Sequence, residues 1–484
     1  MSTEEQENIP QENSSPNKED NNNENNDNNN DTERQTESMP IGSETLLSRE
    51  SYLEDDFNDE KSDKTMWERC CGPIRAGSLR GAVLSLASIV FGICGFTFPI
   101  GFSNLGLIPS FVLLVVLCSI CYWSLSALLF AARKKKILKY GPLIKECLGS
   151  KMALFSDINN IIFCIGILMS YEFTISTFFM DIYGKFFTVT EDNEKLIKLI
   201  QMGGCMLLFQ LPLSLLRNIS KLQYASMVGC AALIYTTLVI FIESPFYYKQ
   251  AMEENPDTKI PWFKPISMKF FDSFSIFLYG FASHNGILPI FDELVKPTKR
   301  RSYEVLRRGY LLEVFVFLFL GMGGFFSLRD PVPSIFISRE DLKFSWMRMD
   351  YFMLASKILF LITLHCSTAI NNNIIRNSFK SLFLPKGQQN FPFPIDFAGV
   401  FFLLLITNGV TFFINDVLKI INIIGGICAV IVSFLSPVMC WMKTNGLPYS
   451  HYKNVLAIIL LVVIVIIGCV SAGYSVYKDI NGED

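Results

Sequence analysis

Two apolar stretches of the chain are each interrupted by Gly and Pro. The first reads Gly92-Ile-Cys-Gly-Phe-Thr-Phe-Pro99, and the second reads Gly280-Phe-Ala-Ser-His-Asn-Gly-Ile-Leu-Pro289. If both are helices, the interruptions leave backbone groups without hydrogen-bond partners. Amides at the positive end of a half-helix can then receive a carboxylate, and the carbonyls can receive an ammonium group or a cation. The pattern therefore suits the binding of a zwitterion.

An ordinary kink is the alternative for either stretch alone, because Gly and Pro are common in membrane helices. Two interruptions that lie five helices apart favour a binding site, because many transporters bind substrate between two broken helices. The residues expected to bind substrate are the small and polar ones at the interruptions. They are Gly92, Cys94, Gly95, Thr97, Gly280, Ser283, Asn285 and Gly286.

Ionisable side chains inside apolar segments are costly and therefore mark functional hypotheses. His284 follows the second interruption, so its protonation near neutral pH can couple to binding; a neutral His bonded to a backbone carbonyl is the alternative. Glu172 has no partner nearby in the sequence, so it is either a proton site or half of a buried ion pair. Hydroxyls around His365 can bind an ion or simply pack. They belong to Thr363, Ser367 and Thr368.

These residues need apolar helices to position them. Half of the 484 residues are hydrophobic and only 18% are charged, a composition that a bilayer accepts better than water does. Apolar runs of about twenty residues, the length that spans a bilayer as a helix, recur from Leu79 onward. We expect eleven spans, near 79–106, 107–132, 152–183, 197–216, 220–243, 270–294, 309–327, 351–374, 395–414, 417–442 and 453–475.

The charges between the spans predict an orientation. Lys and Arg gather in the breaks after the second, fourth, sixth and eighth spans, whereas the breaks after the third and fifth are acidic. Because basic loops stay in the cytosol, the N-terminus is predicted to be cytosolic and the C-terminus outside or lumenal. The basic residues are Arg133, Lys134, Lys135, Lys136, Lys139, Arg217, Lys221, Lys296, Lys299, Arg300, Arg301, Arg307, Arg308, Arg376, Lys380 and Lys386.

Four regions follow along the chain. Residues 1–66 are acidic and Asn-rich with few apolar residues, which predicts a disordered cytosolic tail, either inert or carrying regulatory signals. A juxtamembrane segment covers 67–78, where Cys70 and Cys71 are either palmitoylated or a bland pair. The transporter domain covers 79–477, and a short tail covers 478–484. No cleavable signal peptide is visible, so the first helix is expected to direct insertion.

Two stretches resemble a known family. Leu211-Pro-Leu-Ser-Leu-Leu-Arg-Asn-Ile-Ser-Lys-Leu-Gln-Tyr-Ala-Ser-Met-Val-Gly229 is similar to the turn between the fourth and fifth helices of the amino acid/auxin permease family. The segment from Gly280 to Arg301 resembles the sixth helix of its sodium-coupled neutral and vesicular branches. The resemblance runs from about Ser78 to Tyr477. It implies an all-α integral membrane protein with a leucine-transporter-like fold, in which five plus five inverted helices precede an eleventh and the first and sixth are broken.

The chain departs from the family pattern at two positions. Cys94 occupies the second Gly position of the usual Gly-x-Gly in the first helix. Ser85 stands where sodium-coupled members share an Asn, although a hydroxyl can still bind sodium. We therefore expect the coupling ion to be sodium or a proton, with an uncoupled mechanism left open. The expected coupling residues are Ser85, Ser88, Glu172, His284, Thr363, His365, Ser367 and Thr368.

The sequence thus predicts a secondary active transporter of amino acids, neutral ones above all, working by alternating access in the plasma membrane or an endolysosomal or vacuolar membrane. The alternatives are a membrane receptor that senses amino acids and signals through its tail, and a channel or scaffold. No enzyme motif or basic nucleic-acid-binding face is visible in the chain. The expected partners are an amino acid, the lipid bilayer and a cytosolic protein that binds the tail. The only expected cofactor is the coupling ion.

Overall fold

The computed structural model describes residues 77–90, 93–216, 219–254, 260–295, 297–328, 332, 335–339, 349–384 and 391–481. The predicted tail at 1–66, the pair Cys70 and Cys71, and Gly92 lie outside these residues. The side chain of Cys94 lies outside them as well, although its backbone is described.

Every regular element in the described ranges is helical, which confirms the predicted all-α fold. The long helices α6, α8, α11, α14, α15 and α16 are only weakly amphipathic, as expected where lipid replaces water on the outer faces. In chain order the elements are α4 (Leu79–Val90), η1 (Ile93–Thr97), α5 (Phe98–Leu105), α6 (Leu107–Lys135), α7 (Tyr140–Leu148), α8 (Ser150–Phe186), α9 (Glu191–Cys205), η2 (Met206–Gln210), α10 (Leu211–Ser214), α11 (Ile219–Glu254), α12 (Lys269–Gly280), α13 (His284–Asp292), α14 (Lys299–Leu328), η3 (Phe336–Ser338), α15 (Tyr351–Phe383), α16 (Phe393–Phe412), α17 (Val417–Ile424), η4 (Gly425–Ala429), η5 (Ile431–Leu435), α18 (Ser436–Thr444) and α19 (Tyr452–Asn481).

Ten stretches of the described chain are long and apolar enough to cross a membrane. The first predicted span joins them as an interrupted segment, because η1 divides it into α4 and α5. Two runs of five segments follow, the first opening on α4–α5 and the second on the interrupted pair α12 and α13, before α19 ends the series. This order agrees with the predicted fold, including the broken first and sixth helices.

Several helix ends differ from the predicted spans. Helix α14 begins at Lys299 rather than near residue 309, and α15 continues to Phe383 rather than ending near 374. Hydropathy marks only the part of a helix that suits the bilayer, whereas these helices project polar turns beyond it. The short helix α7 was not predicted, because nine residues cannot span a membrane.

Gly106 makes the turn between α5 and α6 possible. Its φ of 85° is rarely adopted by side chains with a Cβ, and a Cβ there would lie 2.8 Å from the carbonyl oxygen of Pro261. Helix α15 starts with an N-cap, because the Asp350 carboxylate accepts a hydrogen bond of 2.9 Å from the backbone amide of Met353. Local sequence therefore fixes where these segments start and stop.

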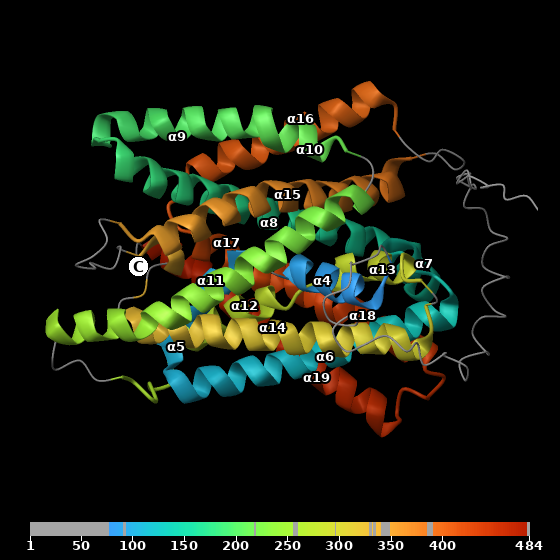
Figure 1. Cartoon of the computed structure of the whole chain (residues 1–484). Coiled ribbons are helices and arrows are strands. Elements are labelled where there is room, and N and C mark those ends of the chain that lie inside the picture. The colour runs from blue at the N-terminus through green and yellow to red at the C-terminus, as the bar shows by residue number, and fades with distance from the viewer. Residues whose placement is uncertain are drawn as a thin grey trace, which may run out of the picture. The chain divides into compact units, whose positions relative to one another are not determined.

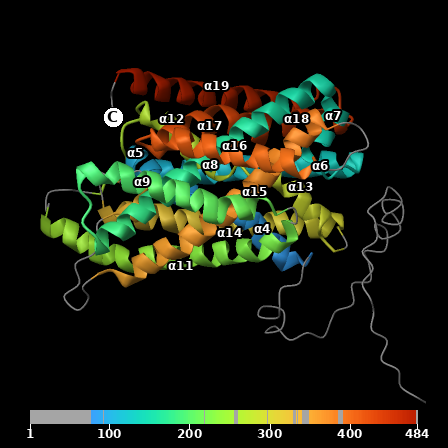
Figure 2. The ribbon, with the colours of Figure 1, turned by 90° about the horizontal axis from the view of Figure 1, so that it is seen from above.

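The spans differ in how much of their surface is buried by neighbouring helices. In an 18-residue apolar stretch of Lys269–Asp292, 89% is buried, whereas the buried share is 28% in the corresponding stretches of Asp192–Ser214 and Tyr452–Asn481. Figure 1 shows α12 within the bundle and α9 with α16 along one flank, and Figure 2 shows α19 along a different edge. The interrupted segments therefore form the centre.

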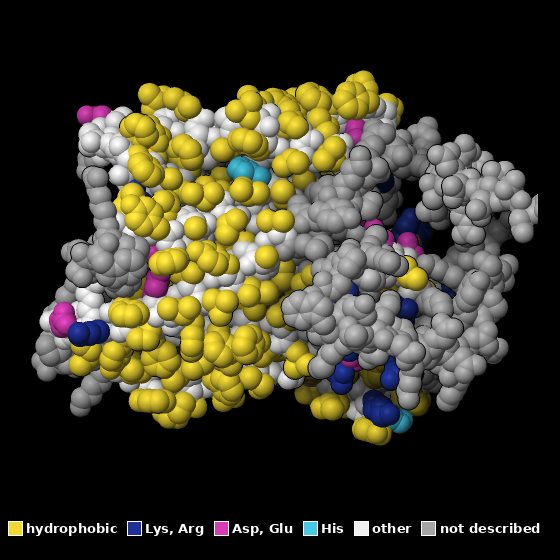
Figure 3. Space-filling model, in the orientation of Figure 1, with side chains coloured by type: hydrophobic (Ala, Val, Ile, Leu, Met, Phe, Trp, Pro, Cys, Tyr) yellow, Lys and Arg dark blue, Asp and Glu magenta, His cyan; other side chains and the backbone are white. Residues whose placement is uncertain are grey.

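The outer surface is apolar over most of the face in Figure 3, where the visible Lys and Arg side chains lie mostly towards one end. Leu208 and Leu456, for example, are 72% and 65% exposed. Such extensive apolar exposure would be unfavourable in water and is stable in lipid. Together with the ten spans, it makes this chain a multi-pass integral membrane protein.

The two ends of the bundle differ in charge. At one end, called the basic end, α6 finishes at Lys135 and α14 starts at Lys299, and the Arg133 guanidinium donates a hydrogen bond of 2.9 Å to the Pro297 carbonyl. Helix α11 finishes at Glu254 at the opposite end, where α12 begins. The predicted second and sixth breaks thus lie together at one end.

Helix α19 docks through small residues. A Cβ on Gly426 of η4 would lie 2.6 Å from the backbone oxygen of Gly468 in α19, so the two backbones touch. Nearby, the hydroxyls of Ser275 and Ser471 are 2.6 Å apart, and Ser471 also donates to the carbonyl of Phe271. Close backbone approach and hydroxyl bonds between helices are the usual means of association in membranes.

Candidate functional site

The two interruptions lie next to each other at the centre of the bundle. Element η1 packs against α12, and α4 packs against α13. Between α12 and α13 the chain leaves the helix for three residues, Phe281, Ala282 and Ser283. The Ser283 amide donates to the Phe281 carbonyl at 3.0 Å, a tight turn rather than a continued helix. The geometry therefore joins the two segments that the sequence singled out.

Glycines allow these segments to touch their neighbours. A Cβ on Gly95 would lie 2.9 Å from Cδ2 of Leu320 in α14, and a Cβ on Gly286 would lie 3.0 Å from Cδ1 of Ile89 in α4. Both glycines are buried. Close packing thus accounts for a glycine at each of these two positions.

Six of the predicted substrate-binding residues have a described burial, and all six lie at this junction and are buried: Gly95, Thr97, Gly280, Ser283, Asn285 and Gly286. Thr97 ends η1, Gly280 ends α12, and Asn285 lies in the first turn of α13. The Ser283 hydroxyl lies beside the phenol of Tyr310 in α14. The junction therefore collects backbone turns and small polar groups of the kind expected to bind a zwitterion.

Aromatic rings fill the side of the junction formed by α5 and α12. The ring of Phe98 stacks on Phe317 with centroids 4.4 Å apart and lies 4.9 Å from Phe277. Phe281 meets Phe317 edge-on at 5.5 Å. All four side chains are at most 1% exposed. This group of Phe98, Phe277, Phe281 and Phe317 is called the ring cluster below.

A chain of polar side chains holds the other side, at α13. The Asn285 amide donates to Oδ1 of Asn160 in α8 at 2.8 Å, and the Asn160 amide donates to the hydroxyl of Ser378 in α15 at 3.0 Å. These three residues form the amide chain. Sequence reasoning included Asn285 and missed Asn160, although an Asn pair inside the predicted third span was a readable signal.

The predicted coupling residues do not form one cluster. Ser88 donates to the carbonyl of Ser85 within α4 at 3.1 Å. Thr363 and Thr368 of α15 donate to carbonyls one turn earlier in their own helix, at 2.9 and 3.0 Å. The side-chain amide of Asn371 donates a hydrogen bond of 3.1 Å to the backbone carbonyl of Ser367. These bonds stay within single helices in this conformation.

The two predicted histidines lie in different environments. His284 is fully buried at the start of α13, against the backbone of Cys121 in α6. The ring of His365 stacks on Phe209 of η2 at 5.5 Å, and Phe209 is 51% exposed. His365 therefore belongs to the flank of the bundle and His284 to the junction.

Glu172 also lies towards this flank. Its Oε2 accepts a hydrogen bond of 2.7 Å from the amide of Gln210, the last residue of η2, and Asn408 of α16 lies 3.5 Å from the Gln210 oxygen. The side chain is buried between α8, η2 and α16. An amide partner, rather than an ion pair, is what the structure gives this carboxyl group.

Sequence reasoning missed a second buried carboxyl group, Glu313 of α14. It is 0% exposed, and neither oxygen has a hydrogen-bond partner among the residues that the structure describes. Glu313 lies inside the predicted span 309–327, so the criterion that selected Glu172 would have selected it too.

The end of the junction remote from the basic end is covered by the short helix η3. Phe336 is fully buried, and its ring lies with Pro99 of α5 against Gly324. Arg339, just after η3, bonds the Glu243 carboxylate of α11 at 2.6 Å and stacks 3.7 Å from the Tyr247 ring centroid. Burial lowers the pKa of Arg339, while Tyr247 and Glu243 oppose that shift. The junction is closed at this end.

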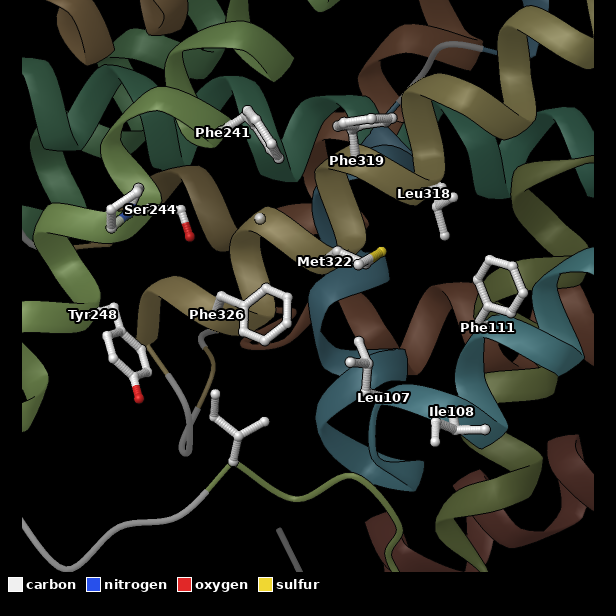
Figure 4. A pocket seen from close by; sticks show the side chains of 13 residues that line it. Leu107, Ile108, Phe111, Phe241, Ser244, Tyr248, Leu318, Phe319, Met322 and Phe326 are labelled. Carbon is white, nitrogen blue, oxygen red and sulfur yellow. The ribbon is translucent and has the colours of Figure 1, made fainter.

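A cavity of about 780 Å³ lies elsewhere, between the start of α6, the end of α11 and the outer half of α14. Figure 4 shows Phe111, Phe241, Tyr248 and Met322 around it. None of the predicted substrate-binding residues lines it. Phe111 and Phe241 are 42% and 50% exposed, so the cavity opens towards lipid. Its lining is almost wholly apolar and offers little to the charged groups of a zwitterion.

Comparisons with known proteins agree with the membrane architecture. A family described as transmembrane amino acid transporter protein matches residues 75–481. The yeast Saccharomyces cerevisiae vacuolar amino acid transporter 6 is 23% identical over 53% of this chain and 57% of its own length. A putative amino acid transporter AAT1 of Plasmodium berghei is 23% identical over 62% of this chain and 47% of its length. The chain thus spans about half the length of these relatives.

Longer matches also occur. Sodium-coupled neutral amino acid transporter 7 of Danio rerio is 22% identical over 83% of this chain and 87% of its length. Among solved structures, a Na⁺-coupled sialic acid symporter in a substrate-bound outward-open state matches 89% of this chain and 95% of its own, with 12% identity and a TM-score of 0.45.

Proposed function

We propose that this chain, which belongs to the transmembrane amino acid transporter family, is a secondary active transporter of amino acids, chiefly neutral ones. The observation that carries the proposal is that the matched region, residues 75–481, contains both interruptions and that they pack against each other. The names of the relatives, which include vacuolar and sodium-coupled neutral amino acid transporters, support the same substrate class.

The junction supports binding of a zwitterion. The half-helix α13 begins at His284 with its amides directed into the junction, and the positive end of a helix attracts a carboxylate. The turns at η1 and at 281–283 offer carbonyls to an ammonium group. The residues proposed to contact substrate are Gly92, Cys94, Gly95, Thr97, Gly280, Ser283, Asn285 and Gly286.

Alternating access is the proposed mechanism. The covering helix η3 and the ring cluster close the junction on one side, and the amide chain closes it on the other. Substrate entry requires one closure to open while the other holds, as in transporters whose halves rock about a central site. We propose coupling to sodium or protons, with the basic end in the cytosol of a plasma, endolysosomal or vacuolar membrane.

The test is uptake into proteoliposomes that contain the purified chain, with each tritiated standard amino acid supplied in turn under a sodium or a proton gradient. Saturable uptake of at least one neutral amino acid is the expected result. Absence of uptake for every amino acid under both gradients would overturn the proposal. Binding without flux would favour a receptor instead.

A matched pair of variants ties uptake to the junction. A side chain on Gly286 would press on Ile89, whereas nothing lies within 4 Å of a Cβ on Gly473 in α19. Gly286→Val is therefore expected to reduce saturable uptake, and Gly473→Val to leave it unchanged. Equal uptake by the two variants would argue against a substrate path through the junction.

A further inference from the structure

Glu313 lies in the middle of α14, fourteen residues after the helix begins at Lys299. The carboxyl group is completely buried, and within the described ranges neither of its oxygens has a hydrogen-bond partner. Counted from the start of the predicted span at residue 309, four residues at 1.5 Å each place Glu313 about 6 Å into the apolar part of the helix. Such a group is expensive to maintain at this depth and therefore calls for a function.

No described cation interacts with it. Helix α14 packs against α4, α5, η1, α6 and α11. The titratable side chains in electrostatic range of the carboxyl group are Cys118 and Cys121 of α6, Cys230 of α11 and Tyr310 of α14 itself. On α4 the charged residue is Arg80, in the first turn at the basic end. The surroundings of Glu313 are thus thiols, a phenol and apolar groups.

Tyr310 connects Glu313 to the junction. It lies one turn before Glu313 on the same face of α14, and its hydroxyl is 3.5 Å from the carbonyl of Phe281, in the turn between α12 and α13. The same phenol lies beside the Ser283 hydroxyl. Cys121 in turn lies against His284. A buried acid is therefore one side chain away from the turn that must move during transport.

An ionised carboxylate in such surroundings would lack both a counter-charge and hydrogen bonds. Removing a charge from water without compensation costs more than the folding energy can supply, so buried groups of this kind take up a proton instead. Glu172 differs, because the Gln210 amide donates to it at 2.7 Å. Of the two, Glu313 has the environment that favours the neutral acid more strongly.

We propose that Glu313 is the site that carries the coupling proton. In the closed conformation the carboxyl group holds the proton as a neutral acid. When the turn at Phe281–Ser283 opens the junction, water reaches Glu313, its O–H bond breaks, and the proton leaves to that water while the carboxylate remains hydrated. The proton is taken up again only with the next substrate, and the empty protein returns with its carboxylate hydrated by the water that fills the vacated site, so one proton moves inward with each amino acid. The inference rests on the proposed amino acid transport and names its driving ion.

The test uses proteoliposomes with an inward proton gradient of one pH unit and a mixture of the tritiated standard amino acids. One-to-one coupling to that gradient supports accumulation of about tenfold. The wild type is expected to approach this ratio and to lose it when a protonophore is added. Glu313→Gln, which mimics the neutral acid, is expected to exchange amino acids across the membrane with an accumulation ratio near one.

Glu304→Gln is the matched control, because Glu304 lies on the same helix but is paired with Arg307 and Arg308 at the basic end. It is expected to accumulate amino acids as the wild type does. Full accumulation by Glu313→Gln would overturn the proposal, and so would wild-type accumulation that follows sodium and ignores pH. A wild type that moves no amino acid at all refutes the proposed function instead, so the two failures are distinguishable.

A second measurement starts from the wild-type protein and uses a variant that keeps the carboxyl group. Infrared difference spectra of the wild-type protein, recorded as the same amino acid mixture is added, are expected to show a change in the carbonyl band of a buried protonated carboxyl group. Glu313→Asp should shift that band, and Glu304→Gln should leave it unchanged. A spectrum without any protonated carboxyl band that responds to amino acids, or one that Glu313→Asp leaves in place, would contradict the assignment.

Discussion

The two sides of the junction are held closed by different forces. On the α5 and α12 side, the ring cluster packs with ring centroids 4.4 to 6.3 Å apart. On the α13 side, the amide chain of Asn285, Asn160 and Ser378 links three helices through bonds of 2.8 and 3.0 Å. The first side is closed by tightly packed aromatic rings, and the second side is closed by hydrogen bonds.

The difference bears on how each side opens. Separating packed rings leaves empty space unless something fills it, which costs free energy in proportion to the cavity. Hydrogen bonds broken by opening can be remade with incoming water, so their net cost is small. We therefore expect the α13 side to open to water more easily than the α5 and α12 side when no substrate is bound.

Removing a ring should have the largest effect. Phe98→Ala deletes the member of the ring cluster that contacts three others, and we expect a loss of about 3–5 kcal/mol in the free energy of unfolding. Thermal unfolding of the purified variant in detergent measures this. Phe413→Ala is the control, because that ring is 80% exposed. If both variants unfold at the same temperature, the ring cluster is not a specific closure.

Breaking the amide chain at its centre should have an intermediate effect. Asn160→Leu leaves the Asn285 amide and the Ser378 hydroxyl without their partner, at a cost of about 1–3 kcal/mol. The thiol of Cys164 lies 3.5 Å from the same Asn285 amide, so it should react faster with a maleimide in this variant.

Asn159→Leu is the control variant. The Asn159 amide donates to the carbonyl of Cys428 in η4, and not to a residue of α13. Mass spectrometry of the labelled peptide measures the reactivity of Cys164 in each variant. Equal labelling in the two variants would mean that the amide chain does not hold α13.

Removing the hydroxyl of Ser378, the last member of the amide chain, should have the smallest effect. Ser378→Ala removes one acceptor from the Asn160 amide, and we expect a loss of about 0.5–1.5 kcal/mol with only slightly faster labelling of Cys164. Ser378→Thr keeps the hydroxyl and should restore both values. A loss as large as that of Phe98→Ala would reverse the proposed order of the two closures.

The fold was largely predictable from the sequence, because interruptions and apolar runs are local signals. The broken first and sixth helices and the all-helical architecture are confirmed, and the family follows from the same residues. Helix ends such as Lys299 were placed wrongly, since hydropathy does not mark the turns that leave the bilayer. The assigned roles of the site residues stay predictions.

Pairings across helices were not predictable. Asn160 and Asn285 are far apart in the sequence, and so are Glu172 and Gln210, so only the packing of the bundle brings each pair together. Glu313 was different, because an acidic residue inside a predicted span is visible without any structure. What no sequence pattern revealed is that Glu313 lacks a partner while Glu172 has one.

The seating of α19 against η4 has a consequence for biosynthesis. Ribosomes make α12 and η4 before α19, so the surface that receives Gly468 and Ser471 exists first without its cover. Until α19 is inserted, Ser275 and the backbone at Gly426 face lipid tails or a membrane chaperone. A chain stalled or cut before Tyr452 would therefore leave the Ser275 hydroxyl and the backbone at Gly426 uncovered by α19.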